Sequence, residues 1–364
     1  MKAIDTNIPS RPRWFQNPLL QPLQEALRPD EWAQRIDPMW SWNSVRARVA
    51  GIEDQTRDCK RFQLQPNRNW RGYEAGQHAL VTLEINGRRL QRAYSLSSAP
   101  ADETIEITVK RQPDGRVSNY LHDQLRVGDV VELGVATGDF VLPADTPKGL
   151  LLISAGSGIT PMLSLLREVK ARAPETDVTL VHSCRNQADF IFAAELHRMA
   201  GELPNFRLIP HFTEASRRLS AADLMVQLAD VAERKTYACG PAAMLEDIET
   251  RWRDAGLSDQ LHVERFGPVA VPRDANASDQ TVDVRCSRSE RVFEAKSKGN
   301  LLEQAERAGL NPAYGCRIGI CQSCRCKKVS GQVKNLLTGE VSAEANESIQ
   351  LCISAAQSEV ELDI

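Results

Sequence analysis

The sequence predicts a multidomain protein made of an antiparallel β-barrel, an α/β domain with a parallel sheet, and a small β-grasp domain at the C-terminus. Three observations predict this order. Alternating strand patterns with tight turns fill residues 44–143, strand–turn–helix units repeat from residue 149, and a hairpin, a helix and a cysteine-rich loop follow residue 281. A chain of 364 residues is long enough for two or three such domains.

Composition narrows the class of protein. The formal charge is −3, 42% of the residues are hydrophobic, and no long run of Lys or Arg is present, so we expect no nucleic-acid partner. No apolar stretch reaches the length of a membrane span, and the first residues lack a signal-peptide core. Nine cysteines, an odd number, fit a reducing compartment better than a disulfide framework. We therefore expect a cytoplasmic protein without a transmembrane segment of its own.

These patterns divide the chain into an N-terminal extension (1–42), a β-barrel (43–145), an α/β domain (146–268), a polar linker (269–280) and a C-terminal domain (281–364). The extension contains a helix-capable stretch, Leu19–Ile36, and four of the six tryptophans, namely Trp14, Trp32, Trp40 and Trp42. It is interpreted either as an arm laid over the next domain or as a docking surface, because exposed aromatic residues are typical of interfaces.

The barrel is predicted from alternating runs. Asn86-Gly87 between residues 79–85 and 88–96 is a strong hairpin signal. Further strands are expected at residues 45–49, 104–110 and 130–135, with a short helix at 118–125.

The α/β domain is predicted from buried strands that alternate with helices. Strands are expected at 150–154, 178–182, 206–209 and 236–239, and helices at 161–173 and 242–255. The C-terminal domain then shows a hairpin (281–285 and 291–295) and a helix (301–308) before the cysteine-rich loop, the order of a β-grasp ferredoxin.

Four cysteines carry the clearest chemical signal. Cys316, Cys321 and Cys324 have the C-x4-C-x2-C spacing of a plant-type [2Fe-2S] cluster, and Cys352 supplies a distant fourth thiolate. The competing interpretation, a structural zinc site, normally uses shorter cysteine pairs on both sides. Cys326 lies in a strand-like run, so we expect a small packed residue there rather than a ligand.

Two turns at strand ends indicate a nucleotide crevice. Gly156 and Gly158 lie between a strand and a helix, where free N–H groups and the helix dipole bind phosphates, although Pro161 departs from the G-x-G-x-x-G fingerprint. Cys239-Gly240-Pro241 forms a second such turn at the start of a helix.

Taken together, six motifs resemble those of the ferredoxin-NADP reductase superfamily, and more narrowly its flavin/NAD(P)H/[2Fe-2S] reductases, over residues 44–364. The motifs are Arg92-Ala93-Tyr94-Ser95, Gly115-Arg116-Val117-Ser118, Gly156-Ser157-Gly158-Ile159-Thr160-Pro161, Cys239-Gly240-Pro241, Glu264-Arg265-Phe266 and the cysteine set.

This resemblance implies roles for individual residues. Arg92 would meet the flavin phosphates, Tyr94 would lie against the flavin ring or ribityl chain, and Ser95 would bond near flavin N5. The Gly115–Ser118 motif, with Val117, would cradle the flavin pyrophosphate, which favours FAD over FMN. Ser95, Thr160 and Cys239 are the predicted catalytic residues. The other predicted cofactor-binding residues are Gly156, Gly158, Gly240, Pro241, Glu264 and Phe266.

The coenzyme is predicted from the end of the second strand of the α/β domain. An acidic residue there would favour NAD, whereas Arg185, with Ser183, favours the 2′-phosphate of NADPH over NADH.

Electrons are thus expected to pass from NADPH to FAD, then singly to the [2Fe-2S] cluster and to an outside acceptor. The domain order and the tryptophan-rich extension resemble the electron-transfer partner of a membrane-bound diiron fatty-acyl (stearoyl-CoA-type) desaturase, which would bring the chain to the membrane surface. The alternatives are the reductase of an aromatic-ring oxygenase or phenylacetyl-CoA epoxidase and, from another class, a redox sensor without turnover.

Overall fold

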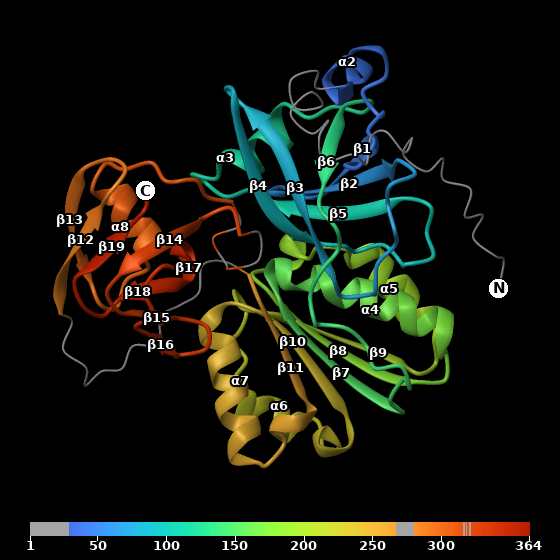
Figure 1. Cartoon of the computed structure of the whole chain (residues 1–364). Coiled ribbons are helices and arrows are strands. Elements are labelled where there is room, and N and C mark those ends of the chain that lie inside the picture. The colour runs from blue at the N-terminus through green and yellow to red at the C-terminus, as the bar shows by residue number, and fades with distance from the viewer. Residues whose placement is uncertain (1–28, 267–279, 316, 318, 320–321) are drawn as a thin grey trace.

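A computed structural model describes residues 29–266, 280–315, 317, 319 and 322–364. It confirms the expected architecture of an antiparallel barrel, a parallel α/β sheet and a small C-terminal domain (Figure 1). Of the predicted N-terminal helix, the structure describes α2 (Pro29–Ile36), and the rest lies outside the described residues. Among the described residues, no helix is long and apolar enough to cross a membrane.

The barrel is a six-stranded antiparallel sheet in the order β4-β3-β6-β1-β2-β5. Its strands are β1 (Val45–Thr56), β2 (Cys59–Pro66), β3 (His78–Ile85), β4 (Arg88–Ser95), β5 (Ile105–Lys110) and β6 (Val130–Leu133). Asn86 (φ 53°) and Gly87 (φ 70°) both have positive φ, as a type I′ turn requires, so the predicted β3–β4 hairpin is confirmed. The end strands β4 and β5 approach each other through the isolated Leu96–Ile107 bridge.

Helix α3 (Arg116–Asp123) packs against β3, β4 and β5 and starts two residues earlier than the sequence pattern suggested. Gly115 is its N-cap, so the short helix follows directly from a turn. Val117 and Leu121 are buried in the barrel core with Phe62 and Leu64, which fixes the start of the helix beside β4.

The α/β domain contains five parallel strands in the order β11-β10-β7-β8-β9. The strands are β7 (Gly149–Ala155), β8 (Asp177–Cys184), β9 (Phe206–Phe212), β10 (Lys235–Gly240) and β11 (Leu261–Arg265). The helices are α4 (Ile159–Arg172), α5 (Ala193–Glu202), α6 (Ala221–Gln227) and α7 (Ala242–Asp254). Central strand β7 is buried along most of its length, as expected for a parallel strand covered on both faces.

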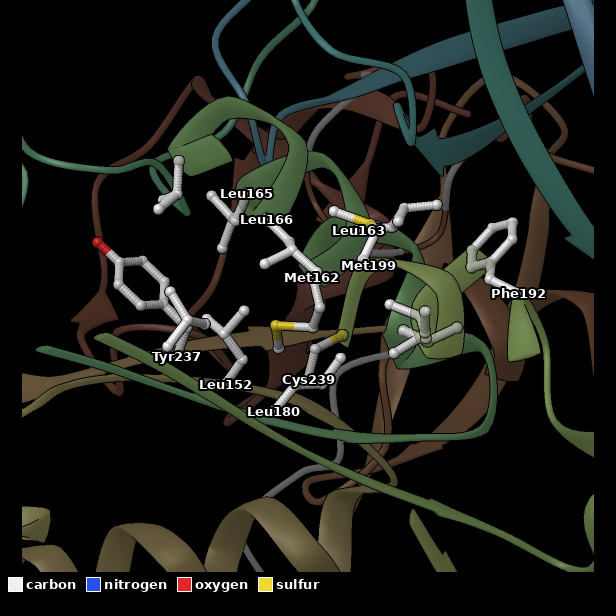
Figure 2. Packing of buried hydrophobic residues seen from close by; sticks show 14 of the residues in the cluster. Leu152, Met162, Leu163, Leu165, Leu166, Leu180, Phe192, Met199, Tyr237 and Cys239 are labelled. Carbon is white, nitrogen blue, oxygen red and sulfur yellow. The ribbon is translucent and has the colours of Figure 1, made fainter. Parts of the chain in front are cut away.

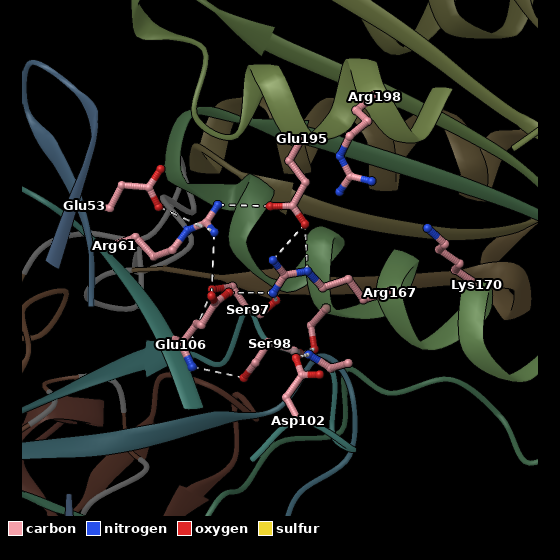
Figure 3. A network of polar contacts seen from close by, with 12 residues as sticks. Glu53, Arg61, Ser97, Ser98, Asp102, Glu106, Arg167, Lys170, Glu195 and Arg198 are labelled. Atoms are coloured by element: carbon pink, nitrogen blue, oxygen red, sulfur yellow. Dashed lines mark hydrogen bonds and ion pairs between the residues drawn. The ribbon is translucent and has the colours of Figure 1, made fainter. Parts of the chain in front are cut away.

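The barrel and the α/β domain are joined by a network of largely buried charges. Figure 3 shows Arg61 of β2 and Arg167 of α4 between Glu106 of β5 and Glu195 of α5. Arg167 Nη1 also donates to the Ser97 carbonyl oxygen, 2.8 Å away. Although burial lowers it, the two carboxylates raise the pKa of Arg167 above its usual value, so the side chain stays charged.

The C-terminal domain has the β-grasp order. Its strands are β12 (Thr281–Cys286), β13 (Arg291–Lys296), β14 (Arg325–Ser330), β15 (Val333–Asn335), β16 (Val341–Ser342), β17 (Glu347–Gln350), β18 (Ser354–Ala356) and β19 (Val360–Leu362). They form a sheet in the order β13-β12-β19-β14-β17 and a smaller one in the order β16-β15-β18. Helix α8 (Leu301–Arg307) packs its buried residues Leu301, Leu302 and Ala305 into the core of this domain.

The residues that follow α2 lie against the barrel. Asn67 Nδ2 donates to the Met39 carbonyl oxygen at 3.1 Å, and Asn69 Nδ2 donates to that of Ser41 at 2.9 Å. Trp40 and Trp42 pack edge to face with ring centroids 4.8 Å apart. This described portion of the extension is therefore anchored to the first domain.

Candidate functional site

A cavity of about 210 Å³ lies where the barrel meets the α/β domain. It is lined by β4, by β5, by the start of α3, by the turn between β7 and α4 and by the residue after β11, so five separate chain segments contribute to it. The lining residues are Arg92, Ala93, Tyr94, Ser95, Thr108, Lys110, Gln112, Gly115, Val117, Ser118, Ser157, Thr160 and Phe266. The structure therefore brings eight of the predicted cofactor-binding residues to one place.

Two hydroxyl groups of this cavity suit a polar ligand. Ser95 and Thr108 are 5% and 6% exposed, and within the described part of the chain their Oγ and Oγ1 atoms have no hydrogen-bond partner. Leaving a buried hydroxyl unpaired costs about 1–3 kcal/mol, so such groups usually face a ligand or an ordered water. The nitrogen and oxygen atoms along the edge of a flavin ring would pair with them, so these residues fit the predicted cofactor.

The Arg92 side chain is held by hydrogen bonds within the protein, which the sequence did not predict. Its Nη1 donates to the carbonyl oxygens of Gln91 and Gly315, both at 2.7 Å, while its side chain lines the cavity. Lys110 of β5 adds a second cation to the lining. Tyr94 also lines the cavity, and burial raises the pKa of its hydroxyl above the usual value, so the ring is neutral.

At the start of α3, the Ser118 hydroxyl stabilises the turn. It donates to the Gly115 carbonyl oxygen and accepts a bond from the Gln112 backbone N–H, both at 3.1 Å. The turn is tight, because a Cβ on Gly115 would lie 2.4 Å from Ser118 Oγ. The backbone N–H groups of the first helical turn remain suited to phosphate, as the motif predicts.

The two nucleotide turns touch each other. A Cβ on Gly158 would lie 2.1 Å from the Cys239 carbonyl oxygen, so only glycine permits this approach.

Each turn also has its own local geometry. Gly156 has φ +55°, a conformation that glycine adopts without strain. Gly240 ends β10, and Pro241 is the N-cap of α7. Thr160, in the first turn of α4, donates from Oγ1 to the Ser157 carbonyl oxygen at 2.9 Å.

Cys239 does not line the cavity. Its side chain is fully buried among Met162, Leu163 and Leu180 (Figure 2). Burial, with a contribution from the Glu264 carboxylate, raises the pKa of its thiol well above the usual value. A protonated, enclosed thiol is a packing group in this arrangement, and its predicted place beside the nicotinamide stays a prediction.

Glu264 and Phe266 lie at the end of β11. Glu264 Oε1 is 3.3 Å from His78 Nδ1 of β3, and its other oxygen is buried with no partner among the described residues. Phe266 lines the cavity and is 42% exposed. The end of the nucleotide domain thus reaches this cavity, and the predicted role of Glu264 and Phe266 in closing the flavin site stays a prediction.

Arg185 borders a second cavity, of about 280 Å³, which is lined by Arg57, Arg185, Asn186, Ala188, Asp189 and Glu214. Its guanidinium is half exposed and pairs with Asp189, with 2.7 Å between Nε and Oδ2. Arg57 supplies a second cation from the barrel, which the sequence motif did not include.

Two of the four predicted cluster ligands are described. Cys324 and Cys352 are both 2% exposed, and their Sγ atoms lie 3.2 Å apart although 28 residues separate them. Two thiols this close can bind one iron, so they fit a [2Fe-2S] cluster. Cys316 and Cys321 lie outside the described residues. Cys326 packs against the core of its domain, and burial raises its pKa to about 12, as expected for a packed residue.

The sequence patterns missed several lining residues, among them Thr108 and Lys110. These two lie on the same face of β5 because side chains alternate along a strand, so knowing that β5 closes the barrel beside β4 would have identified them. Ser157 was present in the glycine turn but was not assigned a role.

Comparisons with known proteins agree with this arrangement. Three family models match the chain: an oxidoreductase FAD-binding domain at residues 46–142, an oxidoreductase NAD-binding domain at 152–250 and a 2Fe-2S iron-sulfur cluster binding domain at 284–357. The chain is similar to an NADPH oxidoreductase of Mycobacterium tuberculosis, with 37% identity over 93% of this chain and 89% of that protein. It is also 30% identical to a component of the 1,2-phenylacetyl-CoA epoxidase of Escherichia coli, over 83% and 89%.

Among solved structures, phthalate dioxygenase reductase is similar to this chain. The TM-score is 0.60 and the identity 27%, and the match covers 88% of this chain and 98% of that one. The cavity, the paired cysteines and these likenesses agree, and the chain belongs to the ferredoxin-NADP reductase superfamily as a three-domain NAD(P)H-dependent oxidoreductase with FAD and a [2Fe-2S] cluster.

Proposed function

We propose that this reductase takes electrons from NADPH and delivers them to an oxygen-activating iron enzyme. The observation that supports this most is the shared cavity, which is lined both by the Arg92–Ser95 motif of the barrel and by Ser157 and Thr160 of the nucleotide turn. A ring held by the barrel and a nicotinamide held by the turn would therefore meet in one place.

Different residues of the cavity would bind different parts of the flavin cofactor. Arg92 and Lys110 offer positive charge to phosphate oxygens, and Ser95 and Thr108 offer unpaired hydroxyls to the ring edge. When bound, the flavin supplies the conversion of a two-electron hydride into the single electrons that a [2Fe-2S] cluster accepts. Tyr94 and Phe266 supply aromatic faces that exclude water from the ring.

NADPH is the proposed coenzyme because two arginines, Arg57 and Arg185, border the second cavity. The similar M. tuberculosis protein is named an NADPH oxidoreductase, which supports the same choice. Losing one charge-assisted bond to a 2′-phosphate costs about 1.5–3 kcal/mol, so Arg185→Ala should lower kcat/KM for NADPH about 10- to 100-fold and leave that for NADH nearly unchanged.

The matched control for this test is Arg198→Ala, which removes an exposed arginine of α5 that pairs with Glu202. It should leave both coenzymes unaffected. Equal losses with NADPH and NADH in Arg185→Ala would argue against a 2′-phosphate site there.

The acceptor we propose first is a membrane-bound diiron fatty-acyl desaturase, as the domain order and the tryptophan-rich extension suggest. An oxygenase is the second candidate. It is supported by the likeness to the phenylacetyl-CoA epoxidase component and by a glycine betaine monooxygenase reductase subunit of Pseudomonas aeruginosa that is 30% identical over 80% of this chain.

An anaerobic titration followed by acceptor mixing tests the proposal. NADPH should bleach both the flavin and the cluster absorbance. The reduced protein should then be reoxidised by a diiron desaturase in membranes faster than by a Rieske-type or epoxidase-type oxygenase component. The reverse order of rates would assign the oxygenase candidate, and absence of bleaching would refute the reductase.

A further inference from the structure

Strand β4 contacts the C-terminal domain at two points. Ser323 Oγ donates to Gln91 Oε1 at 2.9 Å, and Arg92 Nη1 donates to the Gly315 carbonyl oxygen at 2.7 Å. Figure 1 shows the C-terminal domain on the β4 side of the barrel. Gly315 directly precedes Cys316, and Ser323 directly precedes Cys324, so both contacts adjoin predicted cluster ligands. The same strand lines the flavin cavity with residues 92–95.

The Gln91 side chain is held in place from its own sheet. Its Nε2 donates to Thr82 Oγ1 of β3 at 3.0 Å, and the two residues are directly opposite in the β3–β4 ladder. With its amide nitrogen fixed in this way, the amide oxygen points towards Ser323. Gln91 does not line the flavin cavity, so its contact with the C-terminal domain is separate from flavin binding.

The second contact is reinforced by an aromatic ring. Arg92 lies over Tyr314, with 6.0 Å from its Cζ to the ring centroid, and Arg317 lies over the same ring at 4.0 Å. Arg317 in turn donates two hydrogen bonds to the Glu306 carboxylate of α8, at 2.6 and 2.9 Å. The segment that touches β4 is thus connected to the body of its own domain.

We propose that Gln91 is a positioning residue for internal electron transfer: its bond holds Ser323, the residue before the predicted ligand Cys324, beside the flavin-binding strand β4. In the step concerned, one electron leaves the reduced flavin and one electron is gained by the cluster, and each NADPH supplies the pair of electrons for two such steps. The inference rests on the proposed order of transfer and does not depend on the identity of the acceptor.

The expected effect follows from the nature of the bond. The two domains belong to one chain, so docking is intramolecular, and a few weak contacts decide how often the C-terminal domain is docked on β4. A neutral hydrogen bond of this kind corresponds to about a fivefold change in that equilibrium, or about 1 kcal/mol. Gln91→Leu should therefore slow cluster reduction about fivefold and leave flavin reduction unchanged.

Anaerobic stopped-flow mixing with NADPH separates the two steps, because the flavin and the cluster absorb at different wavelengths. Gln91→Glu is the conservative variant: a carboxylate accepts from Ser323 Oγ and also from the Thr82 hydroxyl, so the rate of cluster reduction should return towards that of the unmodified protein. Gln65→Leu is the matched control, because Gln65 is an exposed barrel glutamine that bonds to the Glu103 carbonyl oxygen instead.

Hydrogen exchange of the oxidised protein without NADPH gives a readout other than activity. The amides around Ser323 should exchange faster in Gln91→Leu than in Gln91→Glu or Gln65→Leu. Ser323→Ala should slow cluster reduction as Gln91→Leu does, and the double variant should be no slower than either single one.

Two results would overturn the proposal. One is unchanged cluster reduction and unchanged exchange in Gln91→Leu, and the other is an equal slowing of flavin reduction, which would place the effect in the flavin site. Failure of the proposed function would look different, because NADPH would then fail to reduce the cluster in the unmodified protein.

Discussion

Glu264 of the nucleotide domain lies 3.3 Å from His78 of the flavin barrel, where both side chains are largely buried. Because Glu264 also pairs in register with Cys239 across β10 and β11, this contact ties the barrel to the strand end that carries the second nucleotide turn. Chain segments more than a hundred residues apart therefore hold the two halves of the cavity together.

The unpaired hydroxyls should matter for flavin binding. Ser95→Ala removes one of the two buried oxygen atoms that face the cavity, and the loss of about 1 kcal/mol should weaken FAD binding about fivefold. Flavin fluorescence during titration of the flavin-free protein measures the change. Ser97→Ala is the control, since Ser97 is equally buried but donates to the Glu106 carbonyl oxygen. Equal affinity of Ser95→Ala and the unmodified protein would mean that Ser95 does not contact the flavin.

The contact between the two nucleotide turns should not tolerate a methyl group. Gly158→Ala would place a Cβ 2.1 Å from the Cys239 carbonyl oxygen, so we expect a loss of about 1–3 kcal/mol in stability and a raised KM for the coenzyme. Gly201→Ala is the matched control, because Gly201 lies in α5 with open space around it and should gain about 0.5–1 kcal/mol. Thermal unfolding and steady-state kinetics measure both variants, and a Gly158→Ala protein as stable as Gly201→Ala would contradict the expected clash.

The charge network between the domains should be sensitive to the loss of one cation. Arg167→Met leaves Glu106 and Glu195 with Arg61 as their shared partner, and losing one cation from this largely buried network costs about 1–3 kcal/mol. The temperature at which flavin fluorescence appears on heating should fall clearly. Lys170→Met removes an exposed lysine near Glu202. Its free energy of unfolding should stay within about 0.5 kcal/mol of that of the unmodified protein. Similar release temperatures for the two variants would show that the network does not hold the domains.

The buried His182 should make the α/β domain sensitive to acid. Burial lowers its pKa from 6.5 to about 3, so the folded protein keeps the ring neutral while the unfolded chain takes up a proton below pH 6.5. Stability is thus lost as the pH falls from about 6.5 towards 3, by about 1 kcal/mol between pH 7 and pH 5.5.

Urea unfolding at these two pH values, followed by tryptophan fluorescence, measures this dependence. In His182→Leu the difference between the two pH values should shrink by that amount, even though the variant also loses the 2.8 Å bond to Ser154 at both. An unchanged difference would show that His182 does not titrate on unfolding.

Much of this arrangement could be predicted from local patterns. Asn86-Gly87 specified its hairpin because both residues accept positive φ, and the run that became β7 was hydrophobic enough to be read as a buried parallel strand. The Arg92–Ser95 motif was located correctly on a strand beside the cavity. These signals depend on residues close together in the chain.

What could not be predicted depends on tertiary contacts. Arg61 and Arg167 resemble ordinary surface arginines in the sequence, and only the packing of α4 and α5 against the barrel brings them to Glu106 and Glu195. Helix α6 was missed although Ser220 and Asp223 form a capping box, because the helix has only seven residues. Cys239 follows a strand pattern that does not reveal on which side of the sheet its thiol is enclosed.

The incomplete closure of the barrel has a consequence for evolution. End strands β4 and β5 meet at the Leu96–Ile107 bridge, and the cavity lies beside the part of them that this bridge leaves apart. The order of the strands therefore creates the cavity, whereas side chains such as Thr108 and Gln112 determine which polar groups line it. During evolution these lining side chains can therefore be substituted, which changes the polar environment of the cofactor, while the strands preserve the cavity that binds it.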